Sequence, residues 1–182
     1  MDAALDLNMG MKTKDDSIEK DKKDIASFLL DIAATVAAVW VVFTFVFGMM
    51  TAPDETMYPR VRNGDLVLFF RLEQTYNVGD VVAVRVDGHR YLGRIVAKDG
   101  DTVDLSDDGD LIVNGSVQNE EIFYPTLKDE DSSVQYPVKL KEDEYFILSD
   151  FRSEGADSRE YGPVSRSQVK GKVIALLRRR GI

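Results

Sequence analysis

The reactive side chains of this 182-residue chain are hydroxyls, carboxylates and amines, because it has no cysteine and a single histidine. Without cysteine, a thiol nucleophile, a disulfide and a thiolate zinc site are all excluded. The histidine, His89, lies in the sequence Asp87-Gly88-His89-Arg90, which is typical of an exposed hairpin turn. The acidic run 107–110 lacks the spacing and the distal glutamate of a calcium loop. We therefore expect no metal site, no cofactor, and no thiol or imidazole chemistry.

The charge of the chain excludes another class of function. Its formal net charge is −9, its pI is near 4.7, and its 23 lysines and arginines are spread thinly. Binding to nucleic acid requires a concentrated basic face that neutralises phosphates. We expect no nucleic-acid partner.

One apolar segment indicates a membrane anchor. Ile32 to Met50 is a run of 19 residues without a charge, which at ~1.5 Å per residue nearly spans the ~30 Å hydrocarbon core of a bilayer. The run is longer than the apolar region of a cleaved signal and lacks a small-residue cleavage site. We predict a retained transmembrane helix over residues 27–50, preceded by a disordered tail at 1–26.

The distribution of lysine and arginine predicts the orientation of this anchor. Five lysines precede the apolar run, whereas only Arg60 and Arg62 fall within about 20 residues after it. We expect the N-terminus to stay in the cytoplasm and residues 51–182 to lie outside the cell membrane.

The remainder of the chain has the pattern of a mostly β domain. Short runs rich in β-branched and aromatic residues alternate with Gly-, Asn- and Asp-rich turns. Asn114-Gly115 is a strong signal for a two-residue hairpin. The charged stretch 128–143 is punctuated by Pro137 and predicts a surface insertion. The five clearest strand candidates are 66–71, 81–87, 90–97, 111–113 and 145–148.

Four segments, in order along residues 30–175, resemble the sequence motifs of bacterial type I signal peptidases. The first is the apolar anchor. The others are Thr56-Met57-Tyr58-Pro59 followed by Asn63-Gly64-Asp65; Tyr91-Leu92-Gly93-Arg94-Ile95-Val96 ending in Gly100-Asp101; and Ser149-Asp150-Phe151-Arg152 with Ala156-Asp157-Ser158-Arg159, Gly162-Pro163-Val164 and Gly171-Lys172-Val173. Any one motif is weak, but the ordered set is specific.

This resemblance implies a β-sheet protease fold at the outer membrane face, where exported precursors lose their signal peptides. The chemistry of the family uses a serine nucleophile and a lysine general base. Such a lysine must lose its proton near neutral pH, so it lies desolvated against apolar surface, which lowers its pKa.

The chain departs from the family at the three polar positions of that reaction. Thr56 stands at the nucleophile position, Gly93 at the general-base position, and Gly155 where the family has a serine that holds the lysine amine. Lys98 lies five residues beyond Gly93, and this odd offset predicts the opposite face of a strand. Asp54 and Glu55 precede Thr56, where a carboxylate would repel the oxyanion of the transition state.

Other family positions are retained, and the resemblance implies that they support the structure. Buried acid–arginine pairs among them are expected to brace the loop behind the site. These residues are Met57, Pro59, Arg94, Asp150, Arg152, Asp157, Ser158 and Arg159.

The leading hypothesis is a membrane-anchored, signal peptidase-like protein that is deficient in catalysis and binds peptide or pilin segments by strand pairing. This hypothesis rests on an analogy with the signal peptidase-like proteins that assist pilus assembly in Gram-positive bacteria. The expected partners are therefore exported preproteins, pilin subunits and a sortase. The alternative is an active signal peptidase I with Thr56 as nucleophile. A third possibility is a structural membrane-tethered domain with no peptide groove in use.

Overall fold

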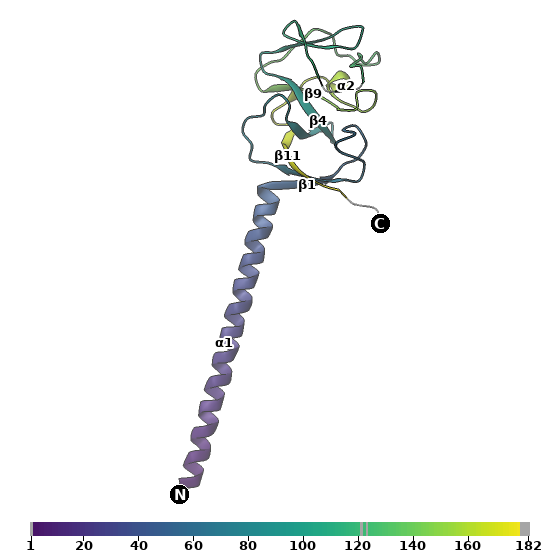
Figure 1. Ribbon diagram of the computed structural model, residues 1–182. Coiled ribbons are helices and arrows are strands. Elements are labelled where there is room, and N and C mark those ends of the chain that lie inside the picture. Colours follow the sequence, from purple (N-terminus) through teal and green to yellow (C-terminus); the bar gives the residue numbers. More distant parts are fainter. Residues whose placement is uncertain (1, 121, 123, 179–182) are drawn as a thin grey trace. The chain divides into compact units, whose positions relative to one another are not determined.

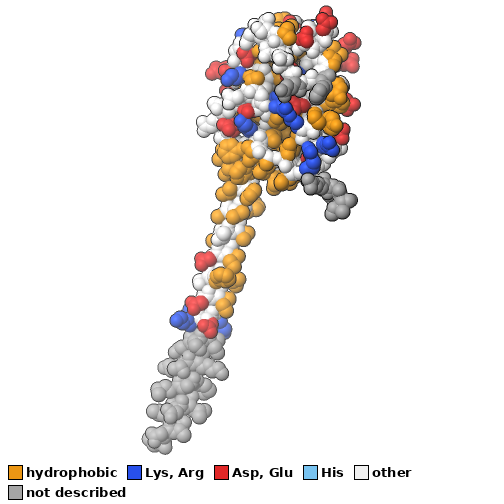
Figure 2. Space-filling model, viewed as in Figure 1, with side chains coloured by type: hydrophobic (Ala, Val, Ile, Leu, Met, Phe, Trp, Pro, Cys, Tyr) orange, Lys and Arg blue, Asp and Glu red, His pale blue; other side chains and the backbone are white. Residues whose placement is uncertain are grey.

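The structure is a computed structural model that describes residues 2–120, 122 and 124–178, with side chains from residue 20 onward. It divides into two units, Met1–Thr44 and Phe45–Ile182. The first unit consists of helix α1 (Asp2–Phe45) (Figure 1). Within it, Lys20–Phe45 contains an 18-residue window with a mean hydropathy of 2.2 and is long and apolar enough to cross a membrane. Charged side chains lie at the lower end of this segment and apolar side chains dominate its upper part (Figure 2), which is typical of a membrane span that begins at a polar surface.

Both boundaries of the helix differ from those expected. The predicted disordered tail at 1–26 is helical from Asp2 onward. This segment has no proline and includes the helix formers Ala, Met and Lys beside its aspartates, so a helix nucleated in the apolar segment can extend through it. At the other end α1 stops at Phe45, because residues 47–51 form a strand instead of completing the predicted span to residue 50.

The second unit is mostly β, as predicted, and contains two antiparallel sheets and the short helix α2 (Ser158–Tyr161). In spatial order the seven-stranded sheet consists of β1 (Phe47–Thr51), β2 (Leu66–Phe70), β11 (Val169–Leu177), β3 (Val81–Val86), β4 (His89–Lys98), β9 (Glu144–Leu148) and β10 (Val164–Ser165). The four-stranded sheet consists of β7 (Ser116–Val117), β6 (Leu111–Val113), β5 (Thr102–Leu105) and β8 (Val138–Lys139). Within this unit, β1 and β11 lie at one end and β9 and α2 towards the other (Figure 1).

Local sequence explains the strands that were predicted. In β3, Val82, Val84 and Val86 are buried in one hydrophobic cluster, while Arg85 between them is exposed. The hairpin between β6 and β7 turns at Asn114 and Gly115, whose φ angles are 54° and 78°. Both angles are positive, as a two-residue hairpin turn requires.

A hydrophobic cluster joins the two sheets. Phe146 and Leu148 of β9 pack in it with Val103 and Leu105 of β5, and all four are 2% exposed or less. Leu140 belongs to the same cluster and is buried. The stretch 128–143 is therefore not purely a surface insertion, because it supplies strand β8 and a core residue.

Candidate functional site

Thr56 lies in the loop between β1 and β2, and its hydroxyl and its backbone N–H both contact one carboxylate. Its hydroxyl donates to Asp54 Oδ1 at 2.6 Å, and its backbone N–H donates to the same oxygen at 3.1 Å. Asp54 is two residues earlier, so this is a local turn of the kind that aspartate favours. The Thr56 side chain and amide are mostly shielded, with the residue 8% exposed. One oxygen of the Asp54 carboxylate thus accepts hydrogen bonds from both the side chain and the backbone amide at the nucleophile position.

The methyl group of Thr56 lies where a side chain at Gly155 would project. A Cβ built on Gly155 would overlap Thr56 Cγ2, and Gly155 has a φ of +96°, which L-residues with side chains rarely adopt. The loop after β9 is tied to Thr56 on the other side by a hydrogen bond from Phe151 N–H to the Thr56 carbonyl at 2.8 Å. The structure therefore brings two of the three predicted site positions, 56 and 155, into direct contact.

Gly93 lies in β4 and faces an apolar cluster. It pairs with Val82 of β3, and a Cβ at position 93 would overlap the Ile147 side chain of β9. Val82 and Ile147 belong to the same buried cluster. Position 93 thus offers the apolar surroundings that a low-pKa lysine needs, but Ile147 fills the space beside the bare α-carbon.

The sequence-based reason for excluding Lys98 was wrong. The register between β4 and β9 shifts between Ile95 and Ala97, so Lys98 pairs with Tyr145, on the same face of β9 as Ile147. The bulge cancels the odd offset in the sequence. Lys98 nevertheless lies exposed at the far end of β4, where its amide contacts Asp101. Lys98 cannot replace a lysine at position 93 because it is exposed and lies at the far end of β4, not because it points to the other face of the strand.

Asp157 and its neighbours form a buried polar network behind the Thr56 loop. Asp157 caps α2 and pairs with Arg159 at 2.8 Å, and its carboxylate also accepts from the Ser149 hydroxyl at 2.8 Å. The Ser158 hydroxyl accepts from the Ile147 amide at 2.9 Å. This network fixes the end of β9 and the loop that contacts Thr56.

The two remaining arginines of the family motifs have separate partners. Arg94 makes a two-pronged contact with Asp150, at 2.8 and 2.6 Å, which raises the pKa of its guanidinium further above its ordinary value. Arg152, only 2% exposed, pairs with Glu120 at 2.9 and 2.6 Å. The sequence reasoning missed Glu120, since it is 32 residues from Arg152 and in no motif.

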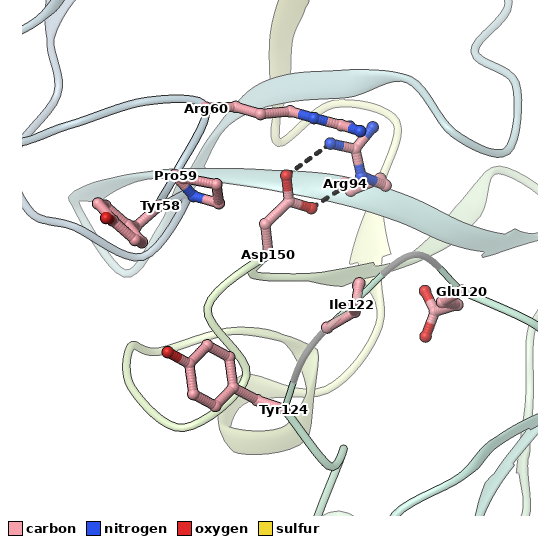
Figure 3. Close-up of a pocket in the computed structure, with 8 residues that line it drawn as sticks. All are labelled: Tyr58, Pro59, Arg60, Arg94, Glu120, Ile122, Tyr124 and Asp150. Carbon is pink, nitrogen blue, oxygen red and sulfur yellow. Dashed lines mark hydrogen bonds and ion pairs between the residues drawn. The ribbon is translucent and has the colours of Figure 1, made fainter.

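A sizeable cavity lies beside these ion pairs and not at Thr56. It measures about 960 Å³, and none of Thr56, Gly93 and Gly155 lines it. Figure 3 shows its lining, in which Asp150 and Arg94 face each other. Of the retained family residues, Pro59, Arg94 and Asp150 line it, whereas Met57 is buried in a hydrophobic cluster.

Comparisons of the sequence with known proteins identify relatives of this chain. Signal peptidase I P of Bacillus subtilis subsp. natto is 28% identical over 155 residues, covering 79% of this chain and 83% of its own. Signal peptidase I S of Bacillus subtilis (strain 168) is 28% identical over 170 residues, covering 87% and 91%, and signal peptidase IB of Staphylococcus aureus (strain COL) is 26% identical over 170 residues, covering 84% and 88%. A crystal structure of a signal peptidase I from Enterococcus faecalis V583 matches at 25% identity with a TM-score of 0.47, covering 56% of this chain and 98% of that one. The family model described as signal peptidase, peptidase S26, matches residues 25–177, and the chain belongs to this family.

Proposed function

We propose that this protein is a membrane-anchored, signal peptidase I-like protein that is deficient in catalysis and binds segments of exported preproteins or pilin subunits. In this proposal the N-terminus is cytoplasmic, residues 51–182 lie outside the membrane, and the protein acts in pilus assembly or protein export, with a sortase as a further partner. One observation in particular supports the proposed loss of catalysis. The Asp54 carboxylate accepts from both the hydroxyl and the amide of Thr56.

Catalytic deficiency follows from what these contacts do to an acyl-transfer reaction. A substrate carbonyl becomes negatively charged in the transition state and needs donors at that point. At position 56 the amide donor is taken by a carboxylate, which would repel the new charge. The general base is missing as well, because Gly93 has no side chain and Ile147 fills the adjoining space. Loss of a general base alone lowers a rate by ~10²–10⁴, and the loss of one member of a catalytic unit by up to ~10⁶.

Binding without cleavage is supported by the edge of the large sheet. Among the described residues β1 is the end strand of the large sheet and pairs with β2 alone, and such an end strand can accept another strand on its outer side. β1 ends at Thr51, in the segment that leads to Thr56. An extended peptide added to this edge would use main-chain hydrogen bonds and needs no nucleophile.

An active peptidase is the second candidate, and one contact favours it. The 2.6 Å hydrogen bond from the Thr56 hydroxyl to Asp54 places a proton acceptor on the nucleophile position. In this mechanism Asp54 takes the hydroxyl proton as Thr56 attacks the scissile carbonyl.

A cleavage assay separates the two candidates. The full chain in detergent micelles is incubated with a preprotein that carries an intact signal peptide, alongside Thr56→Ala and Asp54→Asn. We expect no cleavage by the wild type. Cleavage that both substitutions abolish would establish the active peptidase and overturn the proposal.

A crosslinking experiment in cells tests the binding role. A photoreactive amino acid replaces Met49 on β1, with Val78 as the matched control, since the two residues are 54% and 55% exposed. We expect preprotein or pilin adducts from position 49 and far fewer from 78. Equal yields from the two positions, or none from either, would remove the support for binding at β1.

A further inference from the structure

The cavity beside the Arg94–Asp150 pair has features of a binding site that the Thr56 position does not explain. We call it the aromatic groove. It is lined by Tyr58, Pro59, Arg60, Arg94, Glu120, Ile122, Tyr124 and Asp150 (Figure 3).

The apolar part of the groove is formed by two tyrosine rings that both pack against a third aromatic ring, Phe151. Tyr58 and Tyr124 are each 40% exposed. Both pack edge-on against Phe151, with ring centroids 6.3 and 4.7 Å away. Pro59 also lines the groove, next to Tyr58 (Figure 3). Grooves lined by aromatic rings are typical of surfaces that bind extended proline-rich peptide segments.

Among the described residues, the ion pairs of the groove leave one guanidinium without a carboxylate partner. Asp150 uses both carboxylate oxygens on Arg94, and Glu120 uses both on Arg152. The Arg60 guanidinium also lines the groove, and it makes no ion pair with any residue between 20 and 120 or with residues 122 and 124–178. In Figure 3 the Arg60 side chain extends along the groove towards Arg94. An arginine in this setting favours a carboxylate, which it can bind through two parallel hydrogen bonds.

We propose that the aromatic groove is a second peptide-binding site, which takes an extended segment with an acidic side chain on Arg60 and a proline or aliphatic residue against Tyr58 and Tyr124. This site needs neither the β1 edge nor a nucleophile, so it goes beyond the function proposed above. The Phe151 amide, which donates to the Thr56 carbonyl, connects the two regions.

Peptide titration tests this site. The probes are fluorescent decapeptides with acetylated and amidated ends, each with prolines around a central Glu, Gln or Lys, and they are added to the full chain in detergent micelles at low salt. The blocked ends exclude a terminal carboxylate as the bound group. We expect the Glu peptide to bind roughly fivefold or more tightly than the Gln peptide, and the Lys peptide most weakly.

Three variants locate the binding. Arg60→Ala is expected to bring the Glu/Gln affinity ratio to about one, and Tyr124→Ala to weaken the Glu and Gln peptides alike. Arg90→Ala is the matched control, because Arg90 is an exposed arginine that does not line the groove. Equal affinity of the wild type for Glu and Gln peptides, an unchanged ratio in Arg60→Ala, or an absence of binding would each overturn the proposal. Crosslinking from position 49 is measured separately, so failure at one site does not imply failure at the other.

Discussion

The side chain of Ile147 occupies the space that a side chain at Gly93 would enter. The two residues lie on neighbouring strands, β9 and β4, and face the same buried cluster. Because protein interiors are close-packed, a residue added at position 93 must displace Ile147 or distort the sheet. The glycine at position 93 and the bulk of Ile147 beside it thus belong to the same packing arrangement.

Gly93→Lys and Ile147→Ala are predicted to be coupled in stability. The first overfills the cluster and should lower the free energy of unfolding by about 1–3 kcal/mol. The second opens a cavity and should lower it by about 2–5 kcal/mol. In the double variant the lysine stem enters the space left by Ile147, so its loss should fall short of the sum by about 1 kcal/mol or more. Urea unfolding of the full chain in detergent, followed by tyrosine near-UV circular dichroism, measures all four proteins. Strict additivity would contradict the packing described here.

Glu120→Ala is predicted to be strongly destabilising, although Glu120 lies outside every sequence motif. Its carboxylate is the charged partner of Arg152, whose side chain is fully buried. Removing one member of a buried ion pair leaves the other charge uncompensated and costs about 3–5 kcal/mol. The same urea assay applies, with Asp107→Ala as control. Asp107 is fully exposed and 3.6 Å from Lys128, so its removal should leave the midpoint unchanged. A small effect of Glu120→Ala would show that other partners satisfy Arg152.

Tyr136→Phe is predicted to reduce the sensitivity of the fold to alkaline pH. Burial raises the pKa of the Tyr136 phenol above its ordinary value near 10, and its hydroxyl makes no hydrogen bond to the described part of the chain. A raised folded-state pKa means that the unfolded chain ionises first, so stability is full below about pH 10 and falls as the pH rises further. Each such tyrosine steepens this loss by up to about 1.4 kcal/mol per pH unit.

Unfolding measured from pH 8 to 11 tests this dependence. The free energy of Tyr136→Phe should fall less steeply than that of the wild type. At pH 7 the variant should be as stable or more stable, because it no longer buries an unpartnered hydroxyl. Parallel curves for the two proteins would contradict the prediction.

The sequence predicted those parts of the fold that depend on local pattern. Alternating valines identified β3, and Asn114-Gly115 identified the β6–β7 hairpin, because side-chain direction and positive φ are local properties. β1 was assigned to the membrane helix, since Phe47-Gly48-Met49-Met50 is as apolar as the residues before it. Only its pairing with β2, about 20 residues away, makes this segment a strand.

The candidate site was predictable in its residue types and not in its contacts. The motifs identified positions 56, 93 and 155, but not that the Thr56 methyl group fills the space at Gly155. The β4 bulge that reverses the face of Lys98 leaves no clear mark in the sequence. The pairing of Arg152 with Glu120 was missed for a related reason, because tertiary contacts between distant loops follow no local period.

The cluster shared by β5 and β9 bears on how the domain opens. Phe146 and Leu148 pack in this cluster with Val103, Leu105 and other buried residues. Detachment of the small sheet would therefore expose these side chains to water, so amide protons in β5 and β9 should exchange with solvent through the same opening event rather than through independent fraying.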